Sequence, residues 1–475
     1  MGSSEAPDAP AGSARSTTQI LCVSTLYGAA TLAAALDAGL LGPADRRVLV
    51  VCNNTGTPEL TPPVDGMPGF ERLRGRFDDL VSWNETIEPY HPGSWSPRPD
   101  DIPLWERHLR LAWHLGDARV ELIVESIQVN PALAIAQIFT GAPVEVYADG
   151  LMSYGPTRSK IDPLVGERVR RVLHLDLVPG LDPLLLAEFG VRPEVIPTRA
   201  FTRVLDQLSD AASGIAIAAP SVPPALLLGQ YLSALSILTE HEEEELHLRM
   251  VRGAVALGHT RVVFKPHPAA PAVRWARLEE EAERLGAELT VLDTPVLAEV
   301  LYRRLRPALV IGCFSTALFT ASAFYGIPVR RTGTELLLER LTPYQNSNRV
   351  PVTIVDALLP PLDNASLKQA SPDDASPADG ESHVPDPRIG QLVTAVGFAM
   401  QPQLNPGLRA AAEGYLAALP DERVRRYFKR RRLTTLGLPG GMPGQLSGIP
   451  RNATARRMVR RARKLRRVVL RVGPR

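Results

Sequence analysis

The chain has 475 residues, 45% hydrophobic and 22% charged, which is ordinary globular composition with room for two domains and extensions. It contains no run of about 18 apolar residues, so we expect no membrane-spanning segment. Residues 1–18 are rich in Ala, Ser, Pro and Gly, and we expect a disordered start without a signal peptide. Cys22, Cys52 and Cys313 lack metal-ligand spacing, which favours buried thiols in a reducing compartment.

The formal net charge of +2 is unevenly distributed. Residues 421–475 hold 18 Lys and Arg against 2 Asp and Glu, whereas residues 1–420 hold 35 basic and 49 acidic residues. The sequence therefore combines an acidic body with a strongly basic tail.

The first part of the chain alternates between strand-like and helix-like runs. Strands are expected at Gln19–Leu26, Arg47–Asn53, Leu80–Ile87, Val120–Ile127 and Val144–Tyr147. Helices are expected in an Ala-rich run ending near Gly39 and over Glu71–Asp79, Trp105–Leu115 and Pro131–Phe139. This alternation predicts a parallel sheet covered by helices on both faces. The less regular segment 151–213 is interpreted as the end of this domain plus a crossover.

A second alternating unit starts near Ile215. Its expected strands are Leu226–Leu232, Arg261–Phe264, Glu288–Leu292, Ala308–Ile311 and Pro328–Arg331, and its expected helices are Glu240–Leu257, Trp275–Leu285, Val296–Leu305 and Thr316–Tyr325. The predicted fold class is α/β, with two doubly wound Rossmann-like domains that enclose a central cleft. Neither a G-x-G-x-x-G fingerprint nor a P-loop occurs in the sequence.

These patterns give a predicted domain organisation. The segments are a disordered N-terminus at 1–18, Rossmann-like domains at 19–213 and 214–355, a disordered insertion at 356–391, a helix packing on the body at 392–420, and a basic tail at 421–475.

The tetrapeptide Lys265-Pro266-His267-Pro268 follows a predicted strand. Two prolines restrict the backbone around His267, and ligands of open α/β sheets bind at the carboxyl ends of strands. A rigid imidazole beside a lysine suits an anionic leaving group, to which it can donate a proton or a hydrogen bond. A surface turn that contains a histidine is the alternative interpretation.

Two further strand ends carry candidate chemistry. Asp149 closes the strand that begins at Val144, and we expect Gly150 to permit a sharp turn there. Gly312 to Thr316 join a strand to an apolar helix, with Ser315 as the predicted N-cap and Thr316 in the first turn. Free N–H groups at such a helix start favour a phosphate site, although plain capping is equally compatible with the sequence.

Four weaker candidates for substrate or acceptor contacts are Glu125, Gln128, Asn130 and His91. Asn130 is predicted to cap the helix that begins at Pro131, and structural roles are the favoured interpretation for all of this group. His91 lies in a Pro-rich loop, where an acceptor contact is the most that the sequence indicates.

The order Asp149-Gly150, Lys265-Pro266-His267-Pro268 and Ser315-Thr316 resembles bacterial sialyltransferases and α-2,8-polysialyltransferases of the GT-B fold, of the type found in actinobacterial genomes. That family shares an acidic-acidic-glycine motif, a His-Pro motif and a later Ser-Ser or Ser-Thr pair. The resemblance covers residues 18–355 and includes Trp83-Asn84-Glu85, Glu125–Pro131 and Leu226–Gln230.

The resemblance implies a CMP-sialic acid donor, a glycan acceptor, inversion at the anomeric centre and no metal or other cofactor. Asp149 would take the acceptor proton, and His267 would stabilise the departing CMP phosphate. Ser315 and Thr316 would bind that phosphate, with Lys265, Pro268 and Gly312 beside them and Gly150 on the acceptor side. The chain departs from the family at Ala148, which stands where the family has its first acid.

Two other functions stay open at this stage. A CDP-polyol phosphotransferase of the teichoic-acid type also releases CMP and uses His-Pro motifs. A catalytically inactive, membrane-tethered glycan-binding protein is the second, and Ala148 motivates it. Among enzymes, we expect a transferase that starts or extends a surface glycan such as a capsule polysaccharide.

The basic tail is expected to bind a membrane surface. Ala453–Val472 has an apolar stripe at helical spacing between arginine-rich faces, and Arg423–Arg432 form a second basic cluster. Such a pattern is typical of peripheral attachment to anionic lipid, here at the inner face of the plasma membrane. Nucleic acid is the competing partner, but no binding fold supports it, and Ala453–Val472 has no interleaved aromatic residues.

Overall fold

The computed structural model describes residues 15–148, 150–211, 222–267, 275–362 and 387–442. The chain divides into two compact units, residues 1–415 and 416–475. A disordered insertion was predicted at 356–391. Its first residues belong to helix α13 and its last residues to helix α14. Residues 363–386 lie outside the described residues. The start of the chain at 1–14 and the predicted helix Ala453–Val472 lie outside them as well.

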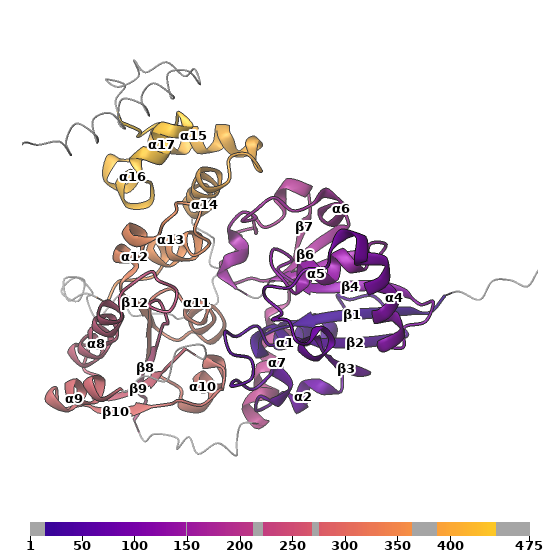
Figure 1. The fold of residues 1–475 in the computed structure, drawn as a ribbon. Helices are drawn as coiled ribbons and strands as arrows, with labels where there is room; N and C mark the ends of the chain where they lie inside the picture. Colours follow the sequence, from indigo (N-terminus) through magenta and orange to yellow (C-terminus); the bar gives the residue numbers. More distant parts are fainter. Residues whose placement is uncertain (1–14, 149, 212–221, 268–274, 363–386, 443–475) are drawn as a thin grey trace, which may run out of the picture. The chain divides into compact units, whose positions relative to one another are not determined.

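The first sheet has seven strands in the order β3-β2-β1-β4-β5-β6-β7 (Figure 1). All are parallel. The strands are β1 Thr17–Val23, β2 Arg46–Val51, β3 Asp79–Ser82, β4 Arg119–Glu125, β5 Val144–Ala148, β6 Val169–Leu175 and β7 Arg192–Ile196. The helices are α1 Leu26–Asp37, α2 Glu71–Arg74, α3 Trp83–Ile87, α4 Ile102–Ala112, α5 Ala132–Ile138, α6 Pro163–Gly166 and α7 Thr198–Ala211. The central strands are nearly continuous apolar runs because both of their faces are buried.

The structure differs from the prediction at several places in this sheet. Segment 151–213, interpreted as the end of the domain plus a crossover, also contains strands β6 and β7, which were missed because charged residues such as Arg171 and Glu194 interrupt their apolar pattern. The first strand ends at Val23 and the fourth at Glu125, short of the predicted ends, and the predicted helix Glu71–Asp79 ends at Arg74. The predicted strand Leu80–Ile87 ends at Ser82, whose hydroxyl accepts a hydrogen bond from Glu85 N at 3.2 Å and so begins helix α3.

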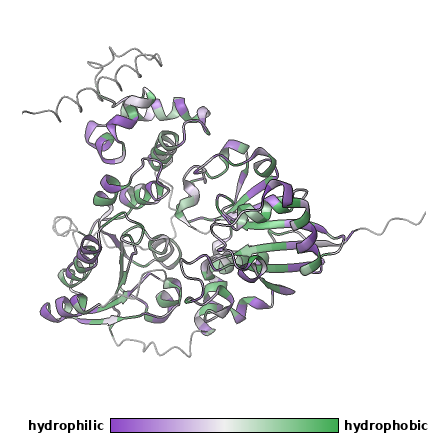
Figure 2. Ribbon diagram, in the orientation of Figure 1, coloured by the Kyte–Doolittle hydropathy of each residue, from purple (hydrophilic) through white to green (hydrophobic). Residues whose placement is uncertain are grey.

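The second sheet has five strands in the order β10-β9-β8-β11-β12, again all parallel. The strands are β8 Ala225–Leu228, β9 Arg261–Lys265, β10 Glu288–Val291, β11 Leu309–Gly312 and β12 Val329–Arg331. The helices are α8 Glu240–Ala256, α9 Ala276–Arg284, α10 Ala298–Leu305, α11 Thr316–Phe319, α12 Thr334–Arg340, α13 Arg349–Leu358 and α14 Pro387–Met400. The prediction of two parallel α/β units in tandem is confirmed. Figure 2 shows the hydrophobic residues gathered along the strands of both sheets.

The predicted strand Leu226–Leu232 ends at Leu228. A Cβ atom at Gly229 would lie 2.8 Å from the Phe264 ring and 3.1 Å from Pro266 Cα, so glycine is required where the chain leaves the sheet. The residues that follow form a loop whose backbone is hydrogen-bonded to side chains of helix α8.

The strand order reverses at a corresponding place in the two sheets. Strand β1 lies between β2 and β4, and strand β8 lies between β9 and β11, so the strand order reverses beside the first strand of each sheet. In open α/β sheets, ligands bind outside the carboxyl ends of the strands at such a switch point. A ligand site is therefore expected at these two edges.

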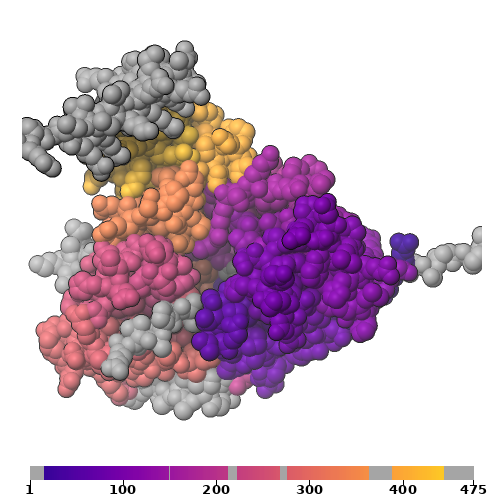
Figure 3. Space-filling view, viewed as in Figure 1, coloured from indigo at the N-terminus to yellow at the C-terminus, as the bar shows by residue number. Residues whose placement is uncertain are grey.

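Helix α7 connects the two sheets and contacts helices of both. Its Phe201 ring meets Tyr27 of α1 at 5.2 Å and Phe324, after α11, at 6.0 Å, both edge to face. Asp206 of α7 forms an ion pair with Arg303 of α10. In the space-filling view of Figure 3, the surface of the chain before α7 adjoins the surface of the chain after it.

The second unit contains α16 Asp421–Tyr427 and α17 Arg430–Leu436, and α15 Arg409–Ala418 crosses the boundary between the units. Val424, Phe428, Leu433 and Leu438 are buried. The exposed basic residues are Arg423, Arg425, Arg426, Arg430 and Arg431, and the exposed acidic residues are Asp421 and Glu422. Across the described parts of both units, we find no helix with the length and apolar character needed to cross a membrane.

Candidate active site at the strand ends

The edge of the first sheet carries a hydrogen-bonded carboxylate at the switch point. Ser24, directly after β1, donates from Oγ to Glu125 Oε2 at 2.5 Å. Glu125 ends β4 and stands opposite Tyr147 in the register of β4 and β5. The Tyr147 hydroxyl in turn donates to Cys22 O at 2.9 Å. Side chains therefore link β1, β4 and β5 where these strands end.

The backbone directly after Glu125 is strained. Ser126 and Ile127 have φ values of 53° and 45°, a region that β-branched side chains rarely adopt and that costs about 1–3 kcal/mol per residue. Ser126 N donates to Tyr147 O at 3.0 Å, which holds the turn against β5. Gln128 is buried, and its Oε1 accepts from Arg158 N at 2.6 Å. Gln128 thus fixes the segment that follows β5.

Asn130 and His91 are held in loops. The prediction that Asn130 caps helix α5 is wrong, because Pro131 takes the cap position and the Asn130 amide donates to Ser96 Oγ at 2.9 Å. His91 Nδ1 accepts from Gly93 N at 3.1 Å, so the other ring nitrogen carries the proton and donates to Thr55 O at 2.9 Å. Both imidazole nitrogens are engaged in local loop structure.

Asp149 lies outside the described residues, but its neighbours show how the first sheet meets the second. Gly150 has an extended backbone with φ −158°, so no left-handed conformation requires glycine at this position. A Cβ atom at Gly150 would instead lie 2.9 Å from Thr316 Oγ1, and Leu151 N donates to that same oxygen at 3.3 Å. Glycine is needed here because the start of helix α11 approaches closely.

His267 follows β9 at the edge of the second sheet, and its ring stacks on Tyr231 with centroids 4.1 Å apart and planes inclined by 29°. Burial, reinforced by the positive charge of Lys265, lowers the pKa of His267 to about 4, against an opposing effect from Glu243. At neutral pH the imidazole is therefore uncharged and presents one N–H donor. Pro268 lies outside the described residues.

Lys265 is only 6% exposed, and its ammonium group is tied to the backbone of two neighbouring loops. Nζ donates to Thr294 O at 2.8 Å and to Pro266 O at 3.3 Å. Burial lowers its pKa to about 8, although the carboxylate of Asp293 acts in the opposite direction. Lys265 thus brings a partly shielded positive charge next to His267.

The predicted capping at β11 is confirmed. Helix α11 begins at Thr316, and Ser315 Oγ accepts from Ala317 N at 3.3 Å. Ser315 and Thr316 are half-buried, so their hydroxyls lie at the surface of this edge. Gly312 is buried as the last residue of β11, where a Cβ atom would lie 3.2 Å from Leu318.

Several residues at these edges escaped the sequence analysis, notably Ser24, Tyr231, Glu243 and His247. Glu243 and His247 are four residues apart on α8 and both are buried, but they stand in a charged run that is typical of an exposed helix. Ser24 and Tyr231 each lie one to three residues beyond a strand. The predicted strands Gln19–Leu26 and Leu226–Leu232 include both residues, so the sequence did not place them at strand ends.

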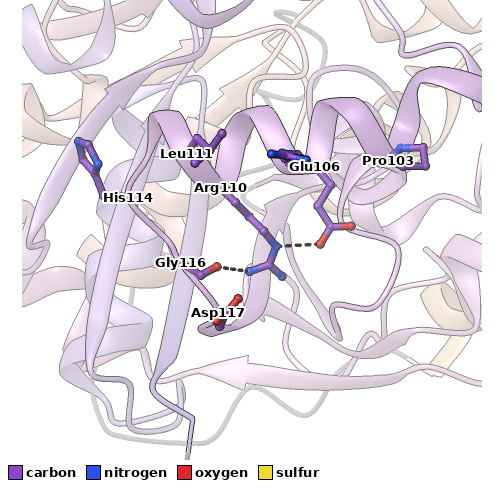
Figure 4. A pocket seen from close by; sticks show the side chains of 8 residues that line it. Pro103, Glu106, Arg110, Leu111, His114, Gly116 and Asp117 are labelled. Atoms are coloured by element: carbon purple, nitrogen blue, oxygen red, sulfur yellow. Dashed lines mark hydrogen bonds and ion pairs between the residues drawn. The ribbon is translucent and has the colours of Figure 1, made fainter.

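An open pocket of about 670 Å³ lies elsewhere, along helix α4 (Figure 4). Within its lining, Arg110 bonds Glu106 at 3.0 Å and Gly116 O at 3.1 Å. Gly116 and Asp117 precede β4, so this pocket is at the amino end of the strand, opposite to the edge that carries Glu125. Among the residues that the structure describes, no cluster of His, Cys, Asp or Glu has the arrangement of a metal site.

Comparison with known proteins gives two kinds of similarity. The solved structure of MurG from Acinetobacter baumannii has a TM-score of 0.38 at 11% identity and covers 84% of this chain and 94% of its own. The UDP-GlcNAc 2-epimerase from Methanocaldococcus jannaschii has a TM-score of 0.40 at 12% identity, with 72% and 99% covered. No curated protein sequence gives a significant match. The model of the alpha-2,8-polysialyltransferase family matches residues 19–332, well over half of the 475 residues, and the chain therefore belongs to this family of glycosyltransferases.

Proposed function

We propose that this glycosyltransferase transfers sialic acid from CMP-sialic acid to a glycan acceptor, with inversion and without a metal ion. The observation that carries the proposal is the contact between Leu151 N and Thr316 Oγ1, 3.3 Å apart. It joins the chain directly after Asp149 to the Ser315–Thr316 pair of the second sheet. A proposed base and a proposed phosphate site thus belong to strand ends that are in contact.

The chemistry follows from the charge that moves. An acceptor hydroxyl attacks the anomeric carbon, the bond from that carbon to the phosphate oxygen breaks, and CMP leaves with an additional negative charge. Hydrogen bonds that strengthen as this charge develops lower the barrier, whereas equal binding of the ground state does not. His267 would supply such a donor, with the hydroxyls of Ser315 and Thr316 as further donors.

Anion binding also changes the protonation of His267. Its low pKa keeps the imidazole neutral in the free enzyme, and a phosphate beside it would raise that pKa. The histidine would therefore become a better proton donor only when the donor substrate is in place. Lys265 would add positive charge near the phosphate while its ammonium group stays hydrogen-bonded to the carbonyl oxygens of Thr294 and Pro266.

On the acceptor side, Asp149 would accept the proton of the attacking hydroxyl. Ala148 precedes it as the last, buried residue of β5, so this position contributes no carboxylate. Glu125 lies at the adjacent strand end, where it holds Ser24 and shapes the edge on which the acceptor would lie.

A CMP-release assay with the purified full-length chain tests this proposal. The panel contains CMP-sialic acid, CDP-glycerol and several UDP-sugars, each with and without a sialylated oligosaccharide, and the His267→Ala variant is the control. We expect acceptor-dependent release of CMP from CMP-sialic acid alone. Release only from CDP-glycerol would identify a polyol phosphotransferase, and glycan binding without any release would identify an inactive binding protein.

We propose further that the basic tail attaches the enzyme to anionic lipid at the inner face of the plasma membrane. The exposed arginines of α16 and α17 support this, since each basic residue near such a surface contributes about 1 kcal/mol. Co-sedimentation with anionic vesicles should require residues 421–475, and neutral vesicles should bind neither form. Equal sedimentation of the truncated chain would contradict the attachment.

A further inference from the structure

We propose that Tyr231 is a positioning residue that fixes the ring plane of His267 and keeps it shielded from water, and that helix α8 holds Tyr231 in place through Glu243 and His247. This inference deepens the proposed function and rests on it, because it assigns a support to the histidine that would act on the departing phosphate.

The contact itself is specific in geometry. The ring centroids of Tyr231 and His267 are 4.1 Å apart and the planes are inclined by 29°, which is a stacked arrangement. Both side chains are half-buried at the edge of the second sheet. The stacked ring covers one face of the imidazole and fixes the orientation of its plane. The directions in which the two ring nitrogens can donate or accept are therefore fixed as well.

The loop that carries Tyr231 is held by buried side chains rather than by a strand. Gly229 N donates to Lys265 O at 2.8 Å, which continues the pairing of β8 and β9 by one residue. Beyond that point, Gln230 N donates to His247 Nε2 at 3.1 Å, and Leu232 N donates to Glu243 Oε1 at 2.5 Å. The amide groups on either side of Tyr231 therefore both bind to α8.

Glu243 closes this arrangement. Its second oxygen accepts from Ser233 N at 3.1 Å and from the Ser233 hydroxyl, so one carboxylate satisfies three donors of the loop. Glu243 and His247 are 7% and 3% exposed, which makes rearrangement costly because the loop amides would be left without partners. Burial lowers the pKa of His247 to about 4, so it stays neutral and able to accept from Gln230 N.

Helix α8 fixes the position of this loop through buried hydrogen bonds as well as through apolar packing. Leu232 is buried and could anchor the loop by itself, yet the side chains of α8 bind the backbone at the residues that flank Tyr231. The charged groups that act on His267 are Lys265 from its own strand and Glu243 from α8, with opposite effects on its charge. The Tyr231 ring covers one face of the imidazole and carries no charge itself.

The test compares three variants of the full-length chain. Tyr231→Ala removes the stacked ring, and Tyr231→Phe keeps the ring and serves as the matched control. His247→Phe removes the acceptor of Gln230 N, which loosens the loop while Tyr231 and the charge of Glu243 are retained. Two quantities are measured for each: the His267 pKa, from NMR titration of labelled histidine assigned with His267→Gln, and the kcat and KM of CMP release.

We expect Tyr231→Ala to raise the His267 pKa by about one unit or more, towards its usual value near 6.5, because water reaches the ring. We expect kcat to fall by about tenfold while the donor KM changes by less than about threefold, as for loss of an interaction made in the transition state. Tyr231→Phe should match the wild type. His247→Phe leaves the charge of Glu243 in place and should shift the titration in the same direction as Tyr231→Ala by a smaller amount.

An unchanged or lowered His267 pKa in Tyr231→Ala would overturn the inference, as would equal losses in Tyr231→Phe and Tyr231→Ala. If Tyr231→Ala does not fold, an unshifted titration in His247→Phe contradicts the role of α8. The NMR titration needs no substrate, so failure of the proposed donor assay would leave this test intact and the two failures are distinguishable.

Discussion

The two sheets share one strand order but differ at their carboxyl ends. The first edge carries the carboxylate of Glu125, which accepts from Ser24 beside a strained turn at Ser126 and Ile127. The second edge carries the imidazole of His267 and the hydroxyls of Ser315 and Thr316, next to the buried ammonium group of Lys265. The same scaffold thus presents a carboxylate on one half and N–H and O–H groups beside a positive charge on the other. A reaction that removes a proton on one side and stabilises an anion on the other uses that difference.

The most severe test of this division is Asp149→Asn. We expect loss of transfer by about a thousandfold or more, because general base catalysis contributes about 10²–10⁴ and an amide cannot accept the proton. CMP affinity, measured by calorimetry, should stay within about threefold of wild type if the first edge acts only on the acceptor. Surviving transfer would place the base at another residue, with Glu125 the next variant to examine.

The corresponding change on the second edge is His267→Ala. We expect kcat to fall by about 10²–10³, the usual cost of removing one electrostatic donor, with a smaller change in donor KM. Initial rates of CMP release across donor concentrations separate the two parameters. Near-normal turnover in this variant is incompatible with the proposed role of the histidine.

The packing between the two halves contains a pH-sensitive group, Glu299 of α10, which is 3% exposed. Burial raises its pKa from 4.5 to about 7, although hydrogen bonds from its own backbone and from Thr320 oppose this shift. The folded state therefore favours the protonated acid, and the associated stability is complete below pH 4.5 and is lost as pH rises through 7.

We therefore expect Glu299→Gln to increase the free energy of unfolding at pH 8 by up to about 3 kcal/mol, since one pKa unit corresponds to about 1.4 kcal/mol. At pH 5 the two proteins should be similar, because the wild-type carboxyl is then largely protonated. Urea unfolding at both pH values measures the difference. An equal effect at the two pH values would mean that Glu299 is not the titrating group.

The smallest effect is expected at the contact between the halves. Thr316→Val removes the acceptor of the buried Leu151 N–H, which should cost about 1–3 kcal/mol of unfolding free energy. Thr316→Ser keeps the hydroxyl and is the matched control. Thermal and urea unfolding provide the measurement, and identical stabilities of the Val and Ser variants would show that this hydrogen bond does not hold the halves together.

Much of the fold could be predicted because its signals are local. Runs such as those of β1 and β2 are apolar on both faces, and only a buried parallel strand requires that pattern. Strands β6 and β7 were missed because they lie near the outer edge, where charged residues interrupt the runs and form surface ion pairs such as Arg171–Glu194. Asn130 was misassigned because Pro131 itself occupies the cap.

Only the site residues that follow strands could be predicted from the sequence. His267, Ser315 and Thr316 follow strands, and the carboxyl end of a strand is a place that sequence can identify. The partners of these residues come from elsewhere in the chain. Thr316 meets Leu151 from 165 positions away, and Glu243 binds a loop whose sequence gives no indication of it.

The sequence by itself determined the alternation of strands and helices and the residues that stand at strand ends, because these depend on local propensity and periodicity, and its motifs indicated the family. Only the tertiary structure decided that Gly150 is needed for the approach of Thr316, that Tyr231 covers His267 and that α8 holds this pair. Those contacts depend on strand order and on how far each helix lies from its sheet. Such distances are set by the packing of the whole core, which no short segment encodes.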